Sequence, residues 1–196
     1  MTDGREVPSD EALVNRARHG ESDALDTLVR RYQDQVYTIV LGMVHNAEDA
    51  LDLTQDVFVR AFSGLERFAG RSGFYTWLYR IAVNRCIDHR RRKTPDTVSL
   101  DDEALRSVGY EPVSRSDYGD PVGSLQAKEL EKEISRAVAA LPDKLQTVVV
   151  LHDIEGLELA EIAQILGCRS GTAKSRLFRG RERIRQRISS VFLDNG

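Results

Sequence analysis

The chain contains 196 residues, of which 41% are hydrophobic and 30% are charged, a composition that allows one or two small globular domains with modest cores. Its formal net charge is only -3, but the charges are so unevenly distributed that this average hides two basic segments, which keeps nucleic acid among the possible partners. The sequence shows no leading apolar signal, no run of 18 apolar residues and no cysteine or histidine spacing typical of a metal site, so we expect a cytoplasmic protein with no membrane insertion, no metal and no cofactor.

The first part of the chain is predicted to be helical throughout. A short helix around Glu11–His19 precedes a long one, in which apolar residues recur at helical spacing over about five turns between Leu25 and Met43. A third helix should begin at Asn46, because Asn46 and Asp49 together resemble a capping box. No periodic β alternation stands out anywhere, so we predict an all-α fold.

The third helix has two different faces. Its apolar members are Leu51, Val57, Phe58, Ala61, Phe62 and Leu65. The opposite face carries Glu48, Asp52, Gln55, Asp56 and Val59. Residues 46–66 hold five acids against one base, so this face is expected to be an acidic surface.

A break at Phe68–Gly73 leads into a fourth helix, from Phe74 to about Arg92, in which aromatic and basic residues interleave. Aromatic rings can stack on unpaired bases at about 1–3 kcal/mol per base while arginines hold the phosphates. For Tyr75, Trp77 and Tyr79 taken singly, packing in the core is the favoured interpretation. Asn84 places a polar amide in the middle of this helix, where it could meet a base edge.

Residues 94–125 lose the apolar period and hold seven acids against two bases, together with three prolines. This composition cannot bury enough apolar surface to fold alone, so we predict an extended acidic linker between two helical domains, at 1–93 and 126–196. The linker could be a plain tether. Alternatively, its negative charge could follow a basic channel on a partner, as a nucleic-acid strand would.

The C-terminal part has the sequence shape of a helix-turn-helix. A helix begun near Asp143 is followed by a short amphipathic helix from Leu157 to Leu166, and Gly167 provides the stop. The next helix is basic, because residues 169–187 hold eight bases and one acid. Such a charge density suits a phosphate backbone, and a short helix, a glycine turn and a basic helix together are typical of a DNA reader.

The basic helix can be divided by its helical period. Ala173, Leu177, Gly180, Ile184 and Ile188 gather on one side, which should face the core. Ser170 is a candidate N-cap, with the amides of Gly171 and Thr172 free to face a phosphate. On the outer side, Ser175, Phe178 and Arg179 could read base edges in the major groove, while Lys174, Arg176 and Arg183 would contact phosphates.

Two other classes of protein fit the residues less well. A helix-turn-helix repressor would explain the C-terminal helices but leaves the acidic and the aromatic-basic helices unexplained. The sequence does not support an enzymatic function, because it has no glycine-rich phosphate loop, nucleophile elbow or metal-ligand spacing, and its acids are expected on solvated faces. We therefore expect no catalytic residue.

Several motifs together carry a resemblance to a known family. They are Asp56–Phe62, the segment Phe74–Asn84 (FYTWLYRIAVN), the acidic linker, and Glu161–Cys168 followed by Lys174–Leu177. In this order and spacing, over nearly the whole chain, the sequence resembles an extracytoplasmic-function sigma factor of bacterial RNA polymerase, of the sigma-70 family.

The resemblance implies a dissociable specificity subunit of RNA polymerase, active in transcription initiation and in stress responses, and without a catalytic site of its own. It implies that the first domain (region 2) docks on the core enzyme and melts the -10 element, and that the second (region 4) reads the -35 element. The implied partners are the clamp helices of the largest polymerase subunit, the flap of the second-largest subunit, promoter DNA in duplex and single-stranded form, and an anti-sigma factor.

Residue by residue, the resemblance implies three sets of contacts. The polymerase-binding set is Asp52, Gln55, Asp56 and Val59. The -10 set is Arg71, in a loop that captures a flipped base, with Arg80, Asn84 and Arg85 on the following helix. The -35 set is Thr172, Lys174, Ser175, Arg176, Phe178, Arg179 and Arg183.

The chain departs from the family pattern at the helix-turn-helix. Arg169 stands where the family often has proline, and Ala173-Lys174 where it often has valine and arginine. These differences concern the -35 sequence that is read and leave the fold unaffected.

Overall fold

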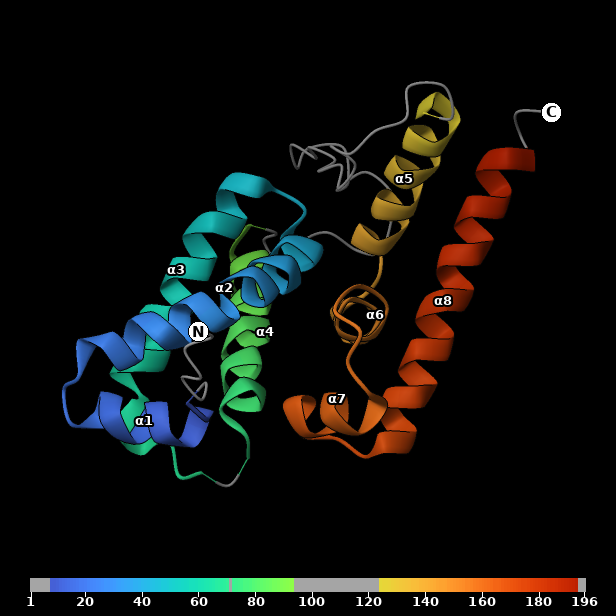
Figure 1. Ribbon diagram of the computed structural model, residues 1–196. Coiled ribbons are helices and arrows are strands. Elements are labelled where there is room, and N and C mark those ends of the chain that lie inside the picture. Colours follow the sequence, from blue (N-terminus) through green and yellow to red (C-terminus); the bar gives the residue numbers. More distant parts are fainter. Residues whose placement is uncertain (1–7, 71, 94–123, 194–196) are drawn as a thin grey trace, which may run out of the picture.

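The computed structural model describes residues 8–70, 72–93 and 124–193, and every regular element in these ranges is helical (Figure 1). The N-terminal unit consists of α1 (Asp10–Arg18), α2 (Ser22–Val44), α3 (Ala47–Ser63), the 3-10 turn η1 (Leu65–Arg67) and α4 (Phe74–Lys93). The C-terminal unit consists of α5 (Ser124–Ala139), α6 (Asp143–Val149), the π-helical turn η3 (Val150–Ile154), α7 (Leu159–Leu166) and α8 (Ser170–Leu193). The predicted all-α fold with two helical domains is confirmed. The predicted linker conformation lies outside the described residues.

The N-terminal unit packs around the long helix α2, which contacts α1, α3 and α4. Leu28 and Ile39 of α2 and Leu78 of α4 are fully buried in this core. The side chain of Asn46 accepts a hydrogen bond of 2.9 Å from the amide of Asp49, and it thereby starts α3 as the sequence predicted.

One apolar prediction in α3 was wrong. Leu51 was expected in the core, but its side chain is 55% exposed. The reason is helical geometry: Leu51 lies four and eight residues before Gln55 and Val59, and therefore shares their outward face rather than that of Val57 and Phe58.

The C-terminal unit packs α6 and α7 against α8. The predicted inner face of α8 is confirmed, since Ala173 and Leu177 are buried and a Cβ on Gly180 would lie 2.7 Å from Cγ2 of Val149. A capping box between Glu158 and Glu161 starts α7, two residues later than predicted. Gly167 ends α7 with φ +60°, in the left-handed region that favours glycine.

The start of α8 differs from the prediction. Ser170 is the first helical residue and not the N-cap, because the carbonyl of Arg169 already accepts hydrogen bonds from the amides of Thr172 (2.9 Å) and Ala173 (3.1 Å). The amide of Thr172 is therefore engaged within the helix. It does not face outward to a phosphate as expected.

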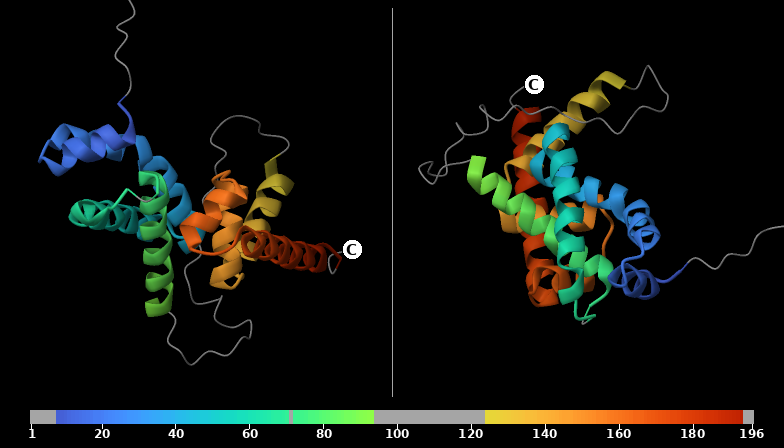
Figure 2. Two further views of the ribbon diagram at one scale, coloured as in Figure 1. Left: turned by 90° about the horizontal axis from the view of Figure 1, so that it is seen from below. Right: turned by 90° about the vertical axis from the view of Figure 1, so that its left-hand side faces the viewer.

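The two units lie against each other rather than apart (Figures 1 and 2). Helix α2 contacts η3, and α4 contacts α7. The N-terminal helix bundle and the helix-turn-helix thus share an interface, although the residues that connect them in sequence lie outside the described ranges.

Candidate protein-binding and DNA-binding faces

The outward face of α3 combines acidic and apolar groups. Asp52, Gln55 and Val59 are exposed and Asp56 is half-buried, so all four residues predicted for polymerase binding lie on one face. Val59 is 62% exposed, which is unusual for a large apolar side chain. Leu51 is similarly exposed on the same helix. Sequence reasoning missed Leu51 here, although its spacing of four residues from Gln55 was a signal that could have found it.

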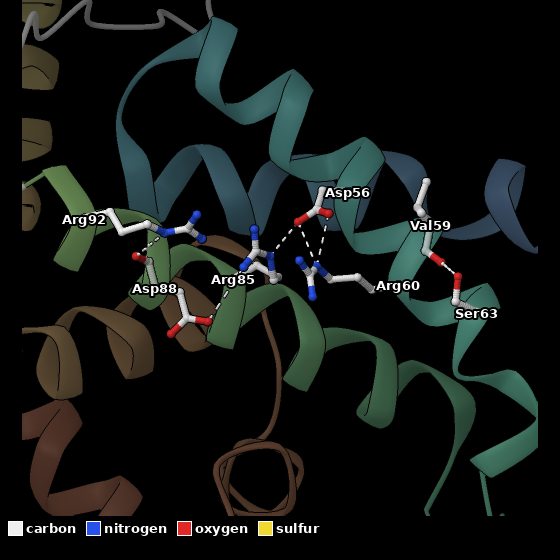
Figure 3. Close-up of polar contacts among 7 residues, drawn as sticks. All are labelled: Asp56, Val59, Arg60, Ser63, Arg85, Asp88 and Arg92. Atoms are coloured by element: carbon white, nitrogen blue, oxygen red, sulfur yellow. Dashed lines mark hydrogen bonds and ion pairs between the residues drawn. The ribbon is translucent and has the colours of Figure 1, made fainter.

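Asp56 is held by two arginines (Figure 3). Nε of Arg60 lies 3.0 Å and Nε of Arg85 2.5 Å from its Oδ2 atom. Burial raises the pKa of the Asp56 carboxyl, but the hydrogen bonds from Arg60 and Arg85 outweigh burial and leave this pKa below its usual value. The carboxylate is therefore kept charged and fixed in orientation.

The residues predicted for -10 DNA differ in their surroundings. Asn84 is exposed on α4 and Arg80 is exposed beside it, whereas the side chain of Arg85 is only 15% exposed and is paired with Asp56 and Asp88. Arg71 lies outside the described residues. Arg80 and Asn84 thus lie four residues apart on the exposed side of α4. Arg85 instead turns toward Asp56 of α3 (Figure 3).

The aromatic residues of α4 mainly pack inside the protein. Tyr79 is 4% exposed, and Trp77 packs against Phe68 with ring centroids 5.0 Å apart. This confirms the interpretation that favoured core packing for these two. Tyr75 is half-buried, and its hydroxyl donates a hydrogen bond of 2.7 Å to Glu161 of α7, a contact that no sequence pattern indicated.

The outer face of α8 is open. Phe178 is 68% exposed, Lys174 and Arg183 are exposed, and Nη2 of Arg179 donates a hydrogen bond of 2.8 Å to Oγ of Ser175. Thr172 is also exposed at the start of the helix, while Arg176 is half-buried. Ser175 therefore orients the guanidinium of Arg179 on the same face as the Phe178 ring.

Residues 8–70, 72–93 and 124–193 offer neither a metal site nor a membrane span. No group of three or more histidine, cysteine, aspartate or glutamate side chains there could hold a metal ion. None of the helices in those ranges is long and apolar enough to cross a membrane.

Two family models match the chain, one for each unit. The model described as sigma-70 region 2 matches residues 28–95, and that described as sigma-70 region 4 matches residues 131–184. Together they span more than half of the sequence, in the order that the helical units have. The chain belongs to the sigma-70 family.

Curated relatives of this sigma factor narrow the group. The ECF RNA polymerase sigma factor SigW of Bacillus subtilis is 37% identical over 180 residues, 91% of this chain and 96% of its own. The ECF RNA polymerase sigma-E factor of Escherichia coli K12 is 35% identical over 188 residues, 93% of this chain and 96% of its own. The sigma factor described here is thus an extracytoplasmic-function (ECF) member of the family.

Solved structures agree on the fold of this sigma factor. CnrH, solved in complex with the cytosolic domain of CnrY, has a TM-score of 0.66 at 22% identity, covering 96% of this chain and 99% of its own. RpoE of Bartonella quintana, solved in complex with the anti-sigma factor NepR, has a TM-score of 0.60 at 21% identity, covering 84% and 96%. As an RNA polymerase sigma factor, the protein directs the polymerase to promoters.

Proposed function

We propose that this sigma factor divides promoter recognition among three faces: α3 docks on core RNA polymerase, α4 with the preceding loop melts and holds the -10 element, and α8 reads the -35 element. The observation that carries the proposal is the contrast between the outward faces of α3 and α8. The first is acidic and apolar around Val59, and the second is basic around an exposed Phe178. The first suits a protein partner and the second suits DNA.

For docking, the proposed partner of α3 is the pair of clamp helices in the largest polymerase subunit. Asp52, Gln55, Asp56 and Val59 form the contact, and exposed Leu51 extends it. Apolar groups supply contact area, while the fixed charge of Asp56 supplies orientation. The flap of the second-largest subunit is the proposed partner of the region 4 unit.

For the -10 element, Arg80 and Asn84 are the proposed contacts on α4, with Arg71 in the loop before it. Arg85 supports this surface from behind, by its pair with Asp56. Capturing an unpaired base shifts the duplex equilibrium toward open DNA, so melting requires no catalytic step by this chain. We propose no enzymatic activity for it and a cytoplasmic location.

For the -35 element, Ser175, Phe178 and Arg179 are the proposed readers of base edges, and Phe178 suits a thymine methyl group. Lys174, Arg176 and Arg183 would contact phosphates and set the register, with Thr172 at the end of the helix nearest the turn. The hydrogen bond between Arg179 and Ser175 supports a reading role, because it fixes the direction of the guanidinium.

An anti-sigma factor is the proposed regulatory partner. An apolar groove of about 650 Å³ runs between α2, α5, η3 and α8, and its lining includes Ile134, Ile184 and Ile188. The lining carries charges of both signs, Glu131 and Asp153 beside Arg181 and Arg185, and Arg181 is paired with Asp153, so the groove suits the apolar face of an amphipathic helix. Two proteins of the same fold were solved with a bound partner: the Bartonella RpoE with the anti-sigma factor NepR, and CnrH with the cytosolic domain of CnrY.

The deciding experiment is run-off transcription from a genomic fragment library by bacterial core polymerase, with and without the purified protein. New start sites, each preceded by a shared pair of sequence elements about 25 base pairs apart, are the expected result. A library that yields no new start site with the protein present would refute the proposal. Val59→Glu tests the docking face in the same assay, because the Val59 side chain is 62% exposed there, and this variant should give no new start sites.

A further inference from the structure

The loop before α4 begins at an aromatic anchor, Phe68. The ring centroid of Phe68 lies 5.0 Å from that of Trp77 and 6.1 Å from that of Phe74, both in the first turns of α4. The contact with Phe74 is edge-on, an arrangement that aromatic rings favour. Ala69 and Gly70, which follow Phe68, are exposed. Phe68 is therefore the last anchored residue before the loop turns outward.

Arg18, at the end of α1, holds both the backbone and the ring of Phe68. Its Nε donates a hydrogen bond of 3.1 Å to the carbonyl of Leu65, and its Nη2 donates one to the carbonyl of Phe68. Leu65 begins η1 and Phe68 follows the last residue of η1. Carbonyls at the end of a helical turn have spare acceptor capacity, which an arginine can fill. The guanidinium carbon of Arg18 also lies over the Phe68 ring, 6.0 Å from its centroid.

Helix α1 is itself fixed along its length, so it can hold Arg18 in place. At its N-terminal end, Asp10 is paired with Arg31 of α2 and accepts a hydrogen bond from the hydroxyl of Tyr32. In its middle, Leu13 is fully buried. The helix has only nine residues, and these contacts keep it against α2. The guanidinium of Arg18 is therefore directed to its carbonyls by a packed helix and not by a free chain end.

Tyr32 connects the other end of α1 to the same aromatic group. The ring centroid of Tyr32 lies 5.8 Å from that of Phe74. Burial, and after it the hydrogen bond to Asp10, raise the pKa of the Tyr32 hydroxyl, so this group stays a hydrogen-bond donor at neutral pH. Helix α1 thus reaches the start of α4 by two routes, from Arg18 through Phe68 and from Asp10 through Tyr32.

The contacts of Arg18 favour support of the loop over direct contact with DNA. A guanidinium binds a phosphate best with a pair of its N–H donors. In Arg18, both Nε and Nη2 already donate to carbonyls. To bind a phosphate with this pair, Arg18 would have to release Leu65 and Phe68, and the loop would lose its anchor.

We propose that Arg18 is a positioning residue for -10 recognition: it fixes Phe68, and through Phe68 the loop before α4, in the conformation that receives an unpaired base. The role in -10 recognition rests on the proposed function of the loop, whereas the hold of Arg18 on Phe68 does not. A loop that is fixed before binding loses less conformational entropy when it takes up a base. Loss of Arg18 therefore weakens capture of the single strand and leaves the -35 reader, in the other unit, unchanged.

Fluorescence of the full chain tests the hold of Arg18 on Phe68. Trp77 is the only tryptophan in the sequence, and Phe68 packs against it. Arg18→Met removes the guanidinium and keeps an apolar stem, so acrylamide should quench Trp77 several-fold more efficiently than in the wild type. Arg16→Met makes the same change in the same helix, where Arg16 is paired with Glu21 at the surface, and should match the wild type.

Equal quenching of Trp77 in Arg18→Met and in the wild type would overturn the proposal. Circular dichroism should show the same helix content in all three proteins. If Arg18→Met loses helix content, Arg18→Lys replaces it, because lysine keeps the charge but lacks the planar fork that reaches two carbonyls. Arg18→Lys should also increase quenching, and a value equal to that of the wild type would again overturn the proposal.

Holoenzyme reconstituted from core polymerase and the full chain tests the role in -10 recognition. The probe is a fluorescently labelled single strand of the -10 element, taken from a promoter found by run-off transcription. Arg18→Met should bind it several-fold more weakly than the wild type with an unchanged salt dependence, whereas Arg16→Met should bind it normally. Equal binding by Arg18→Met, or a salt dependence lowered by about one phosphate contact, would overturn the positioning role.

A duplex that carries the -35 element alone separates positioning from a general loss of structure. All three proteins should bind it equally, and a matching loss by Arg18→Met on both probes would contradict a role confined to the loop. The quenching measurement involves neither nucleic acid nor polymerase. Its failure would refute the hold of Arg18 on the loop alone, whereas failure of run-off transcription would refute the sigma function alone.

Discussion

Nε of Arg85 lies 2.5 Å from Oδ2 of Asp56, so a residue of α4 holds the carboxylate that α3 presents to solvent (Figure 3). The pair crosses between the helix proposed to dock on polymerase and the helix proposed to hold -10 DNA. Arg85 was predicted from the sequence as a DNA contact. Its low exposure instead favours a role in positioning Asp56, with Arg80 and Asn84 left to face the DNA.

Reversing the charge of Asp56 should prevent docking. Asp56→Arg is expected to abolish co-elution with core polymerase in size-exclusion chromatography, because the new guanidinium would face Arg60 and Arg85 and remove the oriented carboxylate. Glu66→Arg makes the same change at an exposed position outside α3 and should leave co-elution intact. Normal co-elution of Asp56→Arg would rule out the α3 face as the docking surface.

The two arginines that hold Asp56 should differ in their effect on stability. Arg85→Met is expected to lower the free energy of unfolding by about 1–3 kcal/mol, because the Arg85 side chain is largely buried. Its loss leaves the half-buried carboxylate of Asp56 with only the ion pair to Arg60. Arg60→Met should lower it by less than about 1 kcal/mol, because Arg60 is 52% exposed and solvent screens its pair. Urea unfolding measures both. A larger loss for Arg60→Met would contradict the burial argument.

Two glycines of α8 make a matched pair for packing. Gly180→Ala should destabilise the region 4 unit by about 1–3 kcal/mol, because its Cβ would lie 2.7 Å from Cγ2 of Val149. Gly171→Ala meets open space in the same helix and should be neutral or stabilising by about 0.5–1 kcal/mol, as alanine is the better helix former. Thermal unfolding followed by circular dichroism separates the two, and equal melting temperatures would show that α8 does not approach α6 this closely.

Acid should weaken the interface between the two units through His45. Burial, with a smaller contribution from Arg90, lowers the pKa of His45 to about 4. Among the charged groups near it, Arg90 lies on α4, and Glu131, Asp153, Arg181 and Arg185 line the adjoining groove. A histidine freed from the interface has a pKa of about 6.5, so burial of neutral His45 stabilises the packed interface fully above pH 6.5, and about 1–2 kcal/mol of that stability is lost by pH 5.

The measurement for His45 is the radius of gyration between pH 7.5 and 5. It should rise toward pH 5 in the wild type and stay constant in His45→Asn, because asparagine tolerates the left-handed backbone of this position (φ 56°) and does not titrate there. The same rise in both proteins would assign the pH effect to other groups.

Reading of the -35 element should depend on different residues from those that supply affinity. Arg179→Ala is expected to cost about 1–3 kcal/mol at one base pair of the element, since Ser175 fixes the direction of that guanidinium. Lys174→Ala should weaken binding to all sequences alike and reduce the salt dependence by about one phosphate contact. A binding profile over single-base variants of the -35 element separates them. A uniform loss for Arg179→Ala would show that it contacts phosphate rather than a base.

The sequence by itself determined the all-helical fold and the inner face of α8, although it placed Leu51 on the wrong face of α3. Helical periodicity alone placed Ala173, Leu177 and Gly180 on the inner side of α8, because a period of 3.6 residues fixes which side chains share a face. Asn46 and Gly167 marked helix ends, because a side-chain cap and a left-handed turn are local properties. The family followed from motif order, which is also contained in the chain alone.

Only the tertiary structure decided what the charged residues of α4 bind. Arg85 turns to Asp56, 29 residues away in sequence, and Arg80 to the carbonyls of Gln164 and Ile165, 84 and 85 residues away. No local pattern encodes such pairs, because an arginine is satisfied equally by a carboxylate, a helix end or a phosphate, and the choice depends on which of them the fold brings within hydrogen-bonding distance.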